Sequence, residues 1–173
     1  HSFPTRRSSD LWQPGGGHVQ MPLWPGKAPD LQAVPGPESM TVDTAHLLAG
    51  KPVTALTNIT RPTMTVYAPK GTNTGAAVVV FPGGGFQILA MDLEGTEVCD
   101  WLASAGITCV LLKYRVPSKP YDWHCDCRPH NLQVPVPALQ DAQRALSLVR
   151  FPAAEWRIDP HRIGVLGFSA GGF

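Results

Sequence analysis

The chain has 173 residues, 43% of them hydrophobic and 16% charged, which is enough for one domain with a sizeable core. Its 14 Lys and Arg residues nearly balance 13 Asp and Glu residues, and no stripe or block of like charge occurs. This pattern argues against a nucleic-acid partner. The longest apolar runs are about five residues, too short to cross a bilayer, so no membrane partner is expected either.

The first eleven residues, HSFPTRRSSDL, contain neither a Met nor the apolar segment of a signal peptide. They match one translated frame of a widely used short-read sequencing adapter. We therefore expect residues 1–11 to be an artefact outside the fold; the alternative is a basic, disordered tail. A reading frame taken from a DNA fragment can be cut at either end, so the absence of a signal peptide here does not indicate the cellular compartment.

Residues 12–62 are rich in Pro, Gly and polar residues and show little periodicity, which predicts an irregular lead-in on the domain surface. Trp12 and Trp24 are expected to anchor this lead-in, by packing rather than by stacking on a ligand. From residue 63 onwards the pattern becomes regular. We assign residues 63–173 to the N-terminal part of one folded domain.

Four segments of this domain have the pattern of strands. The first alternates apolar and polar residues, as a half-buried strand does, and the others are continuous apolar runs typical of strands covered on both faces. The predicted strands are residues 63–68, 76–81, 107–116 and 163–168.

Two helices are predicted between these strands. Asp92 is expected to cap the first, which runs to about Ser104, and Pro137 to open the second, which runs to about Arg150. Strands that alternate with helices indicate right-handed crossovers and a largely parallel sheet, that is, an α/β fold. Spacings of three and four residues predict the apolar faces: Val98, Trp101, Leu102 and Ala105 in the first helix, and Ala138, Ala142, Ala145 and Val149 in the second.

A cluster of potential metal ligands interrupts the domain in DWHCDCRPH, which contains His124, Cys125, Asp126, Cys127 and His130. C-x-C is unusual spacing for a structural zinc site. Three interpretations stay open: a metal site, a disulfide that involves Cys125 or Cys127, and an ordinary loop near the mouth of a ligand site. The last is favoured because the segment follows a parallel strand, where ligands bind in open α/β sheets.

The most informative segment is GVLGFSAGGF at residues 164–173, which contains G-x-S-x-G around Ser169. A hydroxyl needs a base to remove its proton and donors to hold the oxyanion that forms on attack. G-x-S-x-G places a serine on a tight, strained turn between a strand and a helix, and here a predicted strand leads directly into it. Ser169 is therefore the candidate nucleophile; the alternative is an inert serine in a Gly-rich turn.

A second candidate element is FPGGGF at residues 81–86, where three glycines follow a buried strand. Such a segment can turn backbone N–H groups towards one point, as an oxyanion hole requires. The alternatives are a flexible loop and a phosphate-binding loop. The phosphate loop is disfavoured because neither a Lys-Ser/Thr pair nor G-x-G-x-x-G spacing is present.

From about residue 21 to its end, the chain resembles the α/β-hydrolases, and within them bacterial esterases related to acetylxylan esterases and the feruloyl-esterase-like branch. The segments that carry this resemblance are PLWPGKAP, RPTMTVYAP, AAVVVFPGGGF, DLEG, LLKYRVP, PALQDAQRALSLVR and IDPHRIGVLGFSAGG. The last two are the most specific.

The resemblance implies Ser169 as the nucleophile and the backbone amides of Gly84, Gly85 and Ala170 as the oxyanion hole. Pro82 stands where the family often has His, so the hydrogen bonds around the loop should differ. No cofactor and no metal are implied. The implied function is hydrolysis of carboxylic, especially acetyl, esters, with a small ester or an acetylated xylan-type polysaccharide as substrate, in a secreted or periplasmic enzyme. Alternatives are a serine peptidase of the prolyl-oligopeptidase type and a non-catalytic hydrolase-like module.

In this family the nucleophile precedes the acid, Asp or Glu, and then the His base in the sequence. All six histidines here precede Ser169, so we expect the acid and the base to be missing and the chain to be truncated after the nucleophile turn. The sheet should then keep an unpaired edge and an uncovered face, and this chain alone should neither fold stably nor hydrolyse esters. The histidines are His1, His18, His46, His124, His130 and His161.

Overall fold

A computed structural model describes residues 12–116 and 136–173 of the chain. Residues 1–11 and the cluster from His124 to His130 lie outside the described residues, so those expectations stay untested. Among the described residues, five strands form the main sheet. Their order is β1 (Gln20–Pro22), β4 (Thr63–Tyr67), β7 (Thr108–Lys113), β5 (Ala77–Phe81) and β8 (Ile163–Gly167).

The sheet is mixed, and its parallel part is the half that carries the motifs. Strand β5 runs parallel to β7 and to β8, whereas β1 and β4 join antiparallel. All four predicted strands are confirmed, each slightly shorter than expected. One detail was wrong, because β8 is not fully buried: it is last in the sheet order, and Val165 is 60% exposed.

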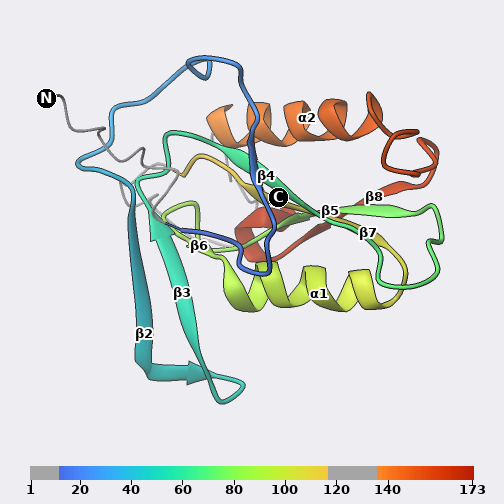
Figure 1. Cartoon of the computed structure of the whole chain (residues 1–173). Helices are drawn as coiled ribbons and strands as arrows, with labels where there is room; N and C mark the ends of the chain where they lie inside the picture. The colour runs from blue at the N-terminus through green and yellow to red at the C-terminus, as the bar shows by residue number, and fades with distance from the viewer. Residues whose placement is uncertain (1–11, 117–135) are drawn as a thin grey trace, which may run out of the picture.

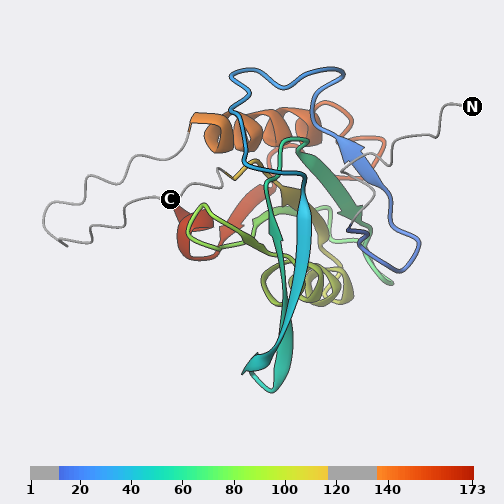
Figure 2. The same ribbon diagram turned by 90° about the vertical axis from the view of Figure 1, so that its left-hand side faces the viewer.

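Two helices cover opposite sides of this sheet, α1 (Glu97–Ser104) on one and α2 (Val136–Arg150) on the other (Figures 1 and 2). The predicted face of α2 is largely confirmed: Ala138, Ala145 and Val149 are buried, and Ala142 is half-buried. No helix in the described ranges is long and apolar enough to span a membrane.

The predicted face of α1 was partly wrong, since Trp101 is 66% exposed while Cys99, Leu102 and Ala103 are buried. A disulfide between Cys99 and Cys109 of β7 fixes which side of the helix meets the sheet. Small residues on that side also allow the helix to approach the sheet closely. Apolar spacing by itself favoured the face that contains Trp101.

Asp92 does not cap α1 as expected. It is the first residue of a π-helical turn, η2 (Asp92–Thr96), that precedes the α-helix. Its carboxylate accepts hydrogen bonds from the backbone of Thr54, at 2.7 Å, and of Leu93, at 2.8 Å. Asp92 thus fastens the start of the helix to a neighbouring strand.

The lead-in over residues 12–62 is less irregular than predicted. Besides β1 it contains a hairpin of β2 (Ser39–Leu48) and β3 (Lys51–Thr57), which pairs with β6 (Leu89–Ala90) and projects from the body of the molecule (Figures 1 and 2). Its turn, Ala49-Gly50, has positive φ at both positions, the geometry of a tight hairpin turn. Asn-Gly would have signalled this turn, whereas Ala-Gly gives almost no sequence signal.

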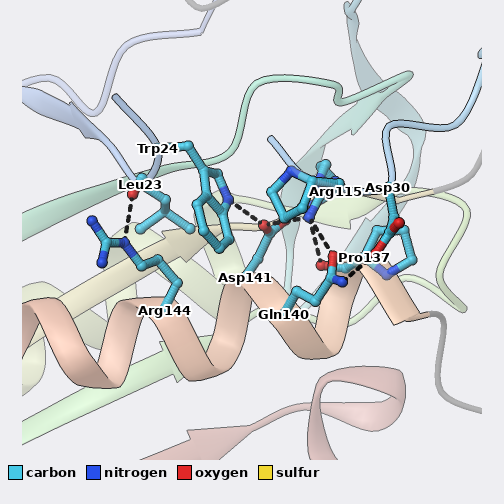
Figure 3. Close-up of polar contacts among 9 residues, drawn as sticks. Leu23, Trp24, Asp30, Arg115, Pro137, Gln140, Asp141 and Arg144 are labelled. Carbon is cyan, nitrogen blue, oxygen red and sulfur yellow. Dashed lines mark hydrogen bonds and ion pairs between the residues drawn. The ribbon is translucent and has the colours of Figure 1, made fainter. Parts of the chain in front are cut away.

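The segment after β7, the helix α2 and the lead-in meet at a buried ion pair (Figure 3). The guanidinium of Arg115 lies 2.9 Å from the Asp141 carboxylate, and both side chains are almost completely buried. Asp141 also accepts a hydrogen bond from the indole N–H of Trp24, at 2.9 Å. The guanidinium of Arg144 lies 5.5 Å from the Trp24 ring centroid. Trp24 also packs against the core cluster, as expected.

A second buried pair lies two residues earlier, at the end of β7. The Lys113 ammonium contacts both carboxylate oxygens of Glu38, at 2.8 and 3.0 Å. Burial raises the pKa of Glu38, although the charge and hydrogen bond of Lys113 oppose that shift. Two buried ion pairs therefore fix the end of β7 and the residues that follow it.

Replacing Asp141 with Ala should leave the Arg115 guanidinium buried without its anion. Loss of one member of a buried ion pair lowers the free energy of unfolding by about 3–5 kcal/mol. At an unchanged m-value, we expect this loss to appear as a lower urea midpoint. Asp100→Ala is the control, because it removes the exposed Lys70–Asp100 pair and should cost less than about 1 kcal/mol. Equal losses in the two variants would contradict the prediction.

Candidate active site

The two glycine-rich motifs meet at one edge of the sheet. Strands β5 and β8 are parallel neighbours in which Phe81 is paired with Gly167, so their carboxyl ends lie side by side. The amide of Phe168 donates to the carbonyl of Phe81, at 3.1 Å, which extends this pairing into the loops. FPGGGF and GFSAGG therefore leave the sheet from adjacent positions.

The candidate nucleophile lies on a strained turn. Phe168 is extended, with φ −107° and ψ 128°, whereas Ser169 has φ 49° and begins a short 3-10 helix, η3 (Ser169–Gly172). A left-handed conformation at a non-glycine residue costs about 1–3 kcal/mol and is concentrated at functional sites. The strand-to-helix turn predicted for G-x-S-x-G is thus confirmed, and Ser169 is exposed at its apex.

The glycines around Ser169 are required because backbones approach closely. A Cβ at Gly167 would overlap the carbonyl of Gly171, and a Cβ at Gly171 would overlap that of Phe81. At Gly83, a Cβ would lie 2.6 Å from the Phe168 oxygen and 3.1 Å from the Ser169 Cβ. A side chain at Gly83 or Gly171 would force the two loops apart, and one at Gly167 would distort the turn that contains Ser169.

The predicted oxyanion residues lie in this contact region. Gly84 and Gly85 follow Gly83 directly and have φ values of 140° and 61°. The Gly84 carbonyl accepts from the amides of Gln87 and Ile88, both at 3.0 Å, which folds the loop back on itself. Ala170, the third expected donor, is buried beside Ser169. The donor role of all three amides stays a prediction.

Two polar side chains that sequence reasoning did not single out hold the glycine loop. Glu94, in η2, accepts a hydrogen bond from the amide of Gly83 at 2.8 Å. The buried hydroxyl of Tyr114 donates to the carbonyl of Pro82 at 2.5 Å. Burial raises the pKa of Tyr114, and the nearby charge of Glu94 raises it further, so this hydroxyl remains a donor. The only sequence signals were DLEG and LLKYRVP, two of the segments that carry the family resemblance.

An apolar hollow of about 490 Å³ adjoins the turn on the side of α2. Residues from β5, α2 and η3 line it, and Ser169 is not among them. Val165, Leu139 and Phe173 on this side are 60%, 47% and 62% exposed. The uncovered sheet face expected from the sequence is therefore present in the described part of the chain.

None of the three histidines that the structure describes lies at this edge. His18 stacks on Tyr67, with ring centroids 4.0 Å apart, and His46 contacts Asp43 in the projecting hairpin. His161 lies in the turn that precedes β8, at the opposite end of that strand from Ser169. Within residues 12–116 and 136–173, no group of three or more His, Cys, Asp or Glu side chains could hold a metal ion.

This arrangement is similar to that of known esterases, although no family model matches the chain. An acetylxylan esterase from Xylanibacter ruminicola is 35% identical over 109 residues, which cover 63% of this chain and 20% of that protein. The fold matches an acetyl ester-xyloside bifunctional hydrolase from Caldicellulosiruptor lactoaceticus with a TM-score of 0.56 and 34% identity, over 89% of this chain and 43% of the other.

A thermophilic esterase from the planctomycete Thermogutta terrifontis also matches, with a TM-score of 0.50 and 27% identity over 77% of this chain and 41% of the other. The described residues thus have the fold of α/β-hydrolase-type esterases, and in sequence the chain is similar to esterases of this type. It spans about a fifth of the length of the curated relative and less than half of the solved structures.

Two glycines of β8 allow a matched test of the close approach. Gly167→Ala should destabilise the protein by about 1–3 kcal/mol, because its Cβ would meet the backbone of Gly171 and Gly172. Gly164→Ala is the control: its Cβ would lie 4.0 Å from the nearest atom, so the change should be neutral or slightly stabilising. Thermal unfolding of the two variants measures the difference, and similar melting temperatures would contradict the steric interpretation.

Proposed function

We propose that the protein containing this chain is a serine hydrolase of carboxylic esters that acts through an acyl-enzyme. The observation that carries the proposal is the turn at Ser169, exposed at φ 49° and in contact with the glycine loop. Strain at an exposed serine beside such a loop suits a nucleophile and has no evident structural purpose. The similarity to several esterases supports the same function.

In the proposed reaction, the Ser169 hydroxyl oxygen attacks the ester carbonyl carbon and loses its proton to a base. The amides of Gly84, Gly85 and Ala170 stabilise the resulting oxyanion, the alcohol departs with a proton, and water then hydrolyses the acyl-serine. The described histidines lie elsewhere, so we assign the base to a residue outside the described part of the chain.

Acetyl esters are the proposed substrate class, and acetylated xylan-type polysaccharide is the proposed natural source. The support is the names of two relatives, an acetylxylan esterase and an acetyl ester-xyloside hydrolase. Secretion or export to the periplasm is proposed alongside. The Cys99–Cys109 disulfide supports it, since disulfides persist mainly in oxidising compartments.

Ser169→Ala should abolish esterase activity. With p-nitrophenyl acetate as substrate, we expect the turnover of the complete protein to fall by about 10³-fold or more, because nothing else can form the acyl-enzyme. Paraoxon, which phosphorylates the Thermogutta esterase, should add its phosphoryl group to Ser169, as intact-protein and peptide masses would report. Ser147→Ala, which changes an exposed serine on α2, is the matched control and should keep both the esterase activity and the reaction with paraoxon. Full activity in Ser169→Ala would refute the proposal.

Acetate release should distinguish the proposed substrate from the alternatives. We expect the complete protein to release acetate from acetylated xylan, and p-nitrophenyl acetate to be hydrolysed faster than the butyrate ester. A proline-containing peptide amide should remain uncleaved, since the proposed site serves esters. Cleavage of the peptide without release of acetate would favour a peptidase.

A further inference from the structure

We propose that Glu94 is a positioning residue of the active site, which fixes the oxyanion loop by accepting the hydrogen bond from the amide of Gly83. This inference rests on the proposed esterase function. It assigns Glu94 a role beside the reacting serine without contact to the reacting atoms.

The carboxylate is close to the nucleophile. The point where a Cβ of Gly83 would lie is 2.8 Å from the Glu94 Oε2 atom and 3.1 Å from the Ser169 Cβ. A side chain at Gly83 would therefore clash with Glu94 and crowd Ser169, so Gly83 lies between these two side chains.

Gly83 is held at both of its backbone polar groups. Its amide donates to Glu94 at 2.8 Å, and its carbonyl accepts from the amide of Ala90 at 3.1 Å. The bond to the carboxylate is charge-assisted, and such bonds are about twice as strong as neutral ones. Because Gly83 already donates to Glu94, its amide is not one of the proposed oxyanion donors, which are the amides of Gly84, Gly85 and Ala170.

The backbone around Glu94 is fixed by contacts of the neighbouring residues. The next residue, Gly95, packs so closely that a Cβ would lie 3.1 Å from Leu111 of β7 and 3.7 Å from Pro82. Asp92, two residues earlier, is bonded to the backbone of Thr54. The π-helical turn that contains all three residues is a local departure from α-helix, and such turns are frequent at functional sites.

Three variants of the complete protein test the proposal. Glu94→Ala removes the acceptor, Glu94→Gln keeps a neutral acceptor of equal length, and Glu97→Ala is the matched control one turn later, where only the exposed ion pair with Lys51 is lost. We expect kcat for p-nitrophenyl acetate to fall by up to about 100-fold in Glu94→Ala with KM nearly unchanged, because misplaced catalytic groups weaken transition-state binding alone. Glu94→Gln should recover most of kcat, and Glu97→Ala should match the wild type.

A second readout does not depend on activity. Hydrogen exchange of the Gly83 amide, measured by mass spectrometry on peptides that cover residues 81–90, should be about tenfold faster in Glu94→Ala than in the wild type, with Glu94→Gln close to wild type. Unchanged exchange in Glu94→Ala would overturn the inference, as would unchanged kcat or an equal loss of kcat in Glu94→Gln. If the wild type hydrolyses no ester, the proposed function fails, and the exchange rates alone decide whether Glu94 fixes the loop.

Discussion

The close approach of two backbones at the carboxyl ends of β5 and β8 is the constraint on which the candidate site depends. Parallel pairing carries Phe81 and Gly167 to the same level, and the loops that follow approach closely at Gly83 and at Gly171. Side chains at these positions would force the loops apart. The exposed, left-handed serine and the turn of glycine amides beside it are consequences of that contact.

The rest of the fold holds this edge in place from behind. Strand β7, next to β5, ends at Lys113 and is followed by Arg115, and the buried ion pairs of these two residues attach the lead-in and α2 to the sheet. A disulfide fastens α1 to the same strand. Buried ion pairs contribute little net stability compared with apolar packing, yet loss of one partner is costly. Their effect here is to fix a single arrangement of the segments around the site.

The site also shows how unremarkable side chains can organise a reaction centre. Ser169 and the glycines supply the nucleophile and the proposed donors, but Glu94 and Tyr114 hold the loop that carries those donors. Neither residue forms part of a recognisable catalytic motif. Their contribution follows from which backbone groups they bind, and a change in either should reach the reaction only through the loop.

The sequence alone determined the parts of this protein that depend on local chemistry. Alternation in the first strand and apolar runs in the other three predicted β4, β5, β7 and β8, and glycine spacing predicted the tight turn at Ser169, because tight turns and buried strands restrict the residues that fit them. Only the tertiary structure decided the hairpin of β2 and β3, the buried face of α1, and the role of Glu94. Each of these depends on a partner in another element: β6 for the hairpin, Cys109 for the helix, and Gly83 for the carboxylate. Such pairings leave no periodic trace, since a strand, a helix face or a carboxylate with a partner in another element has the same local sequence as one without it.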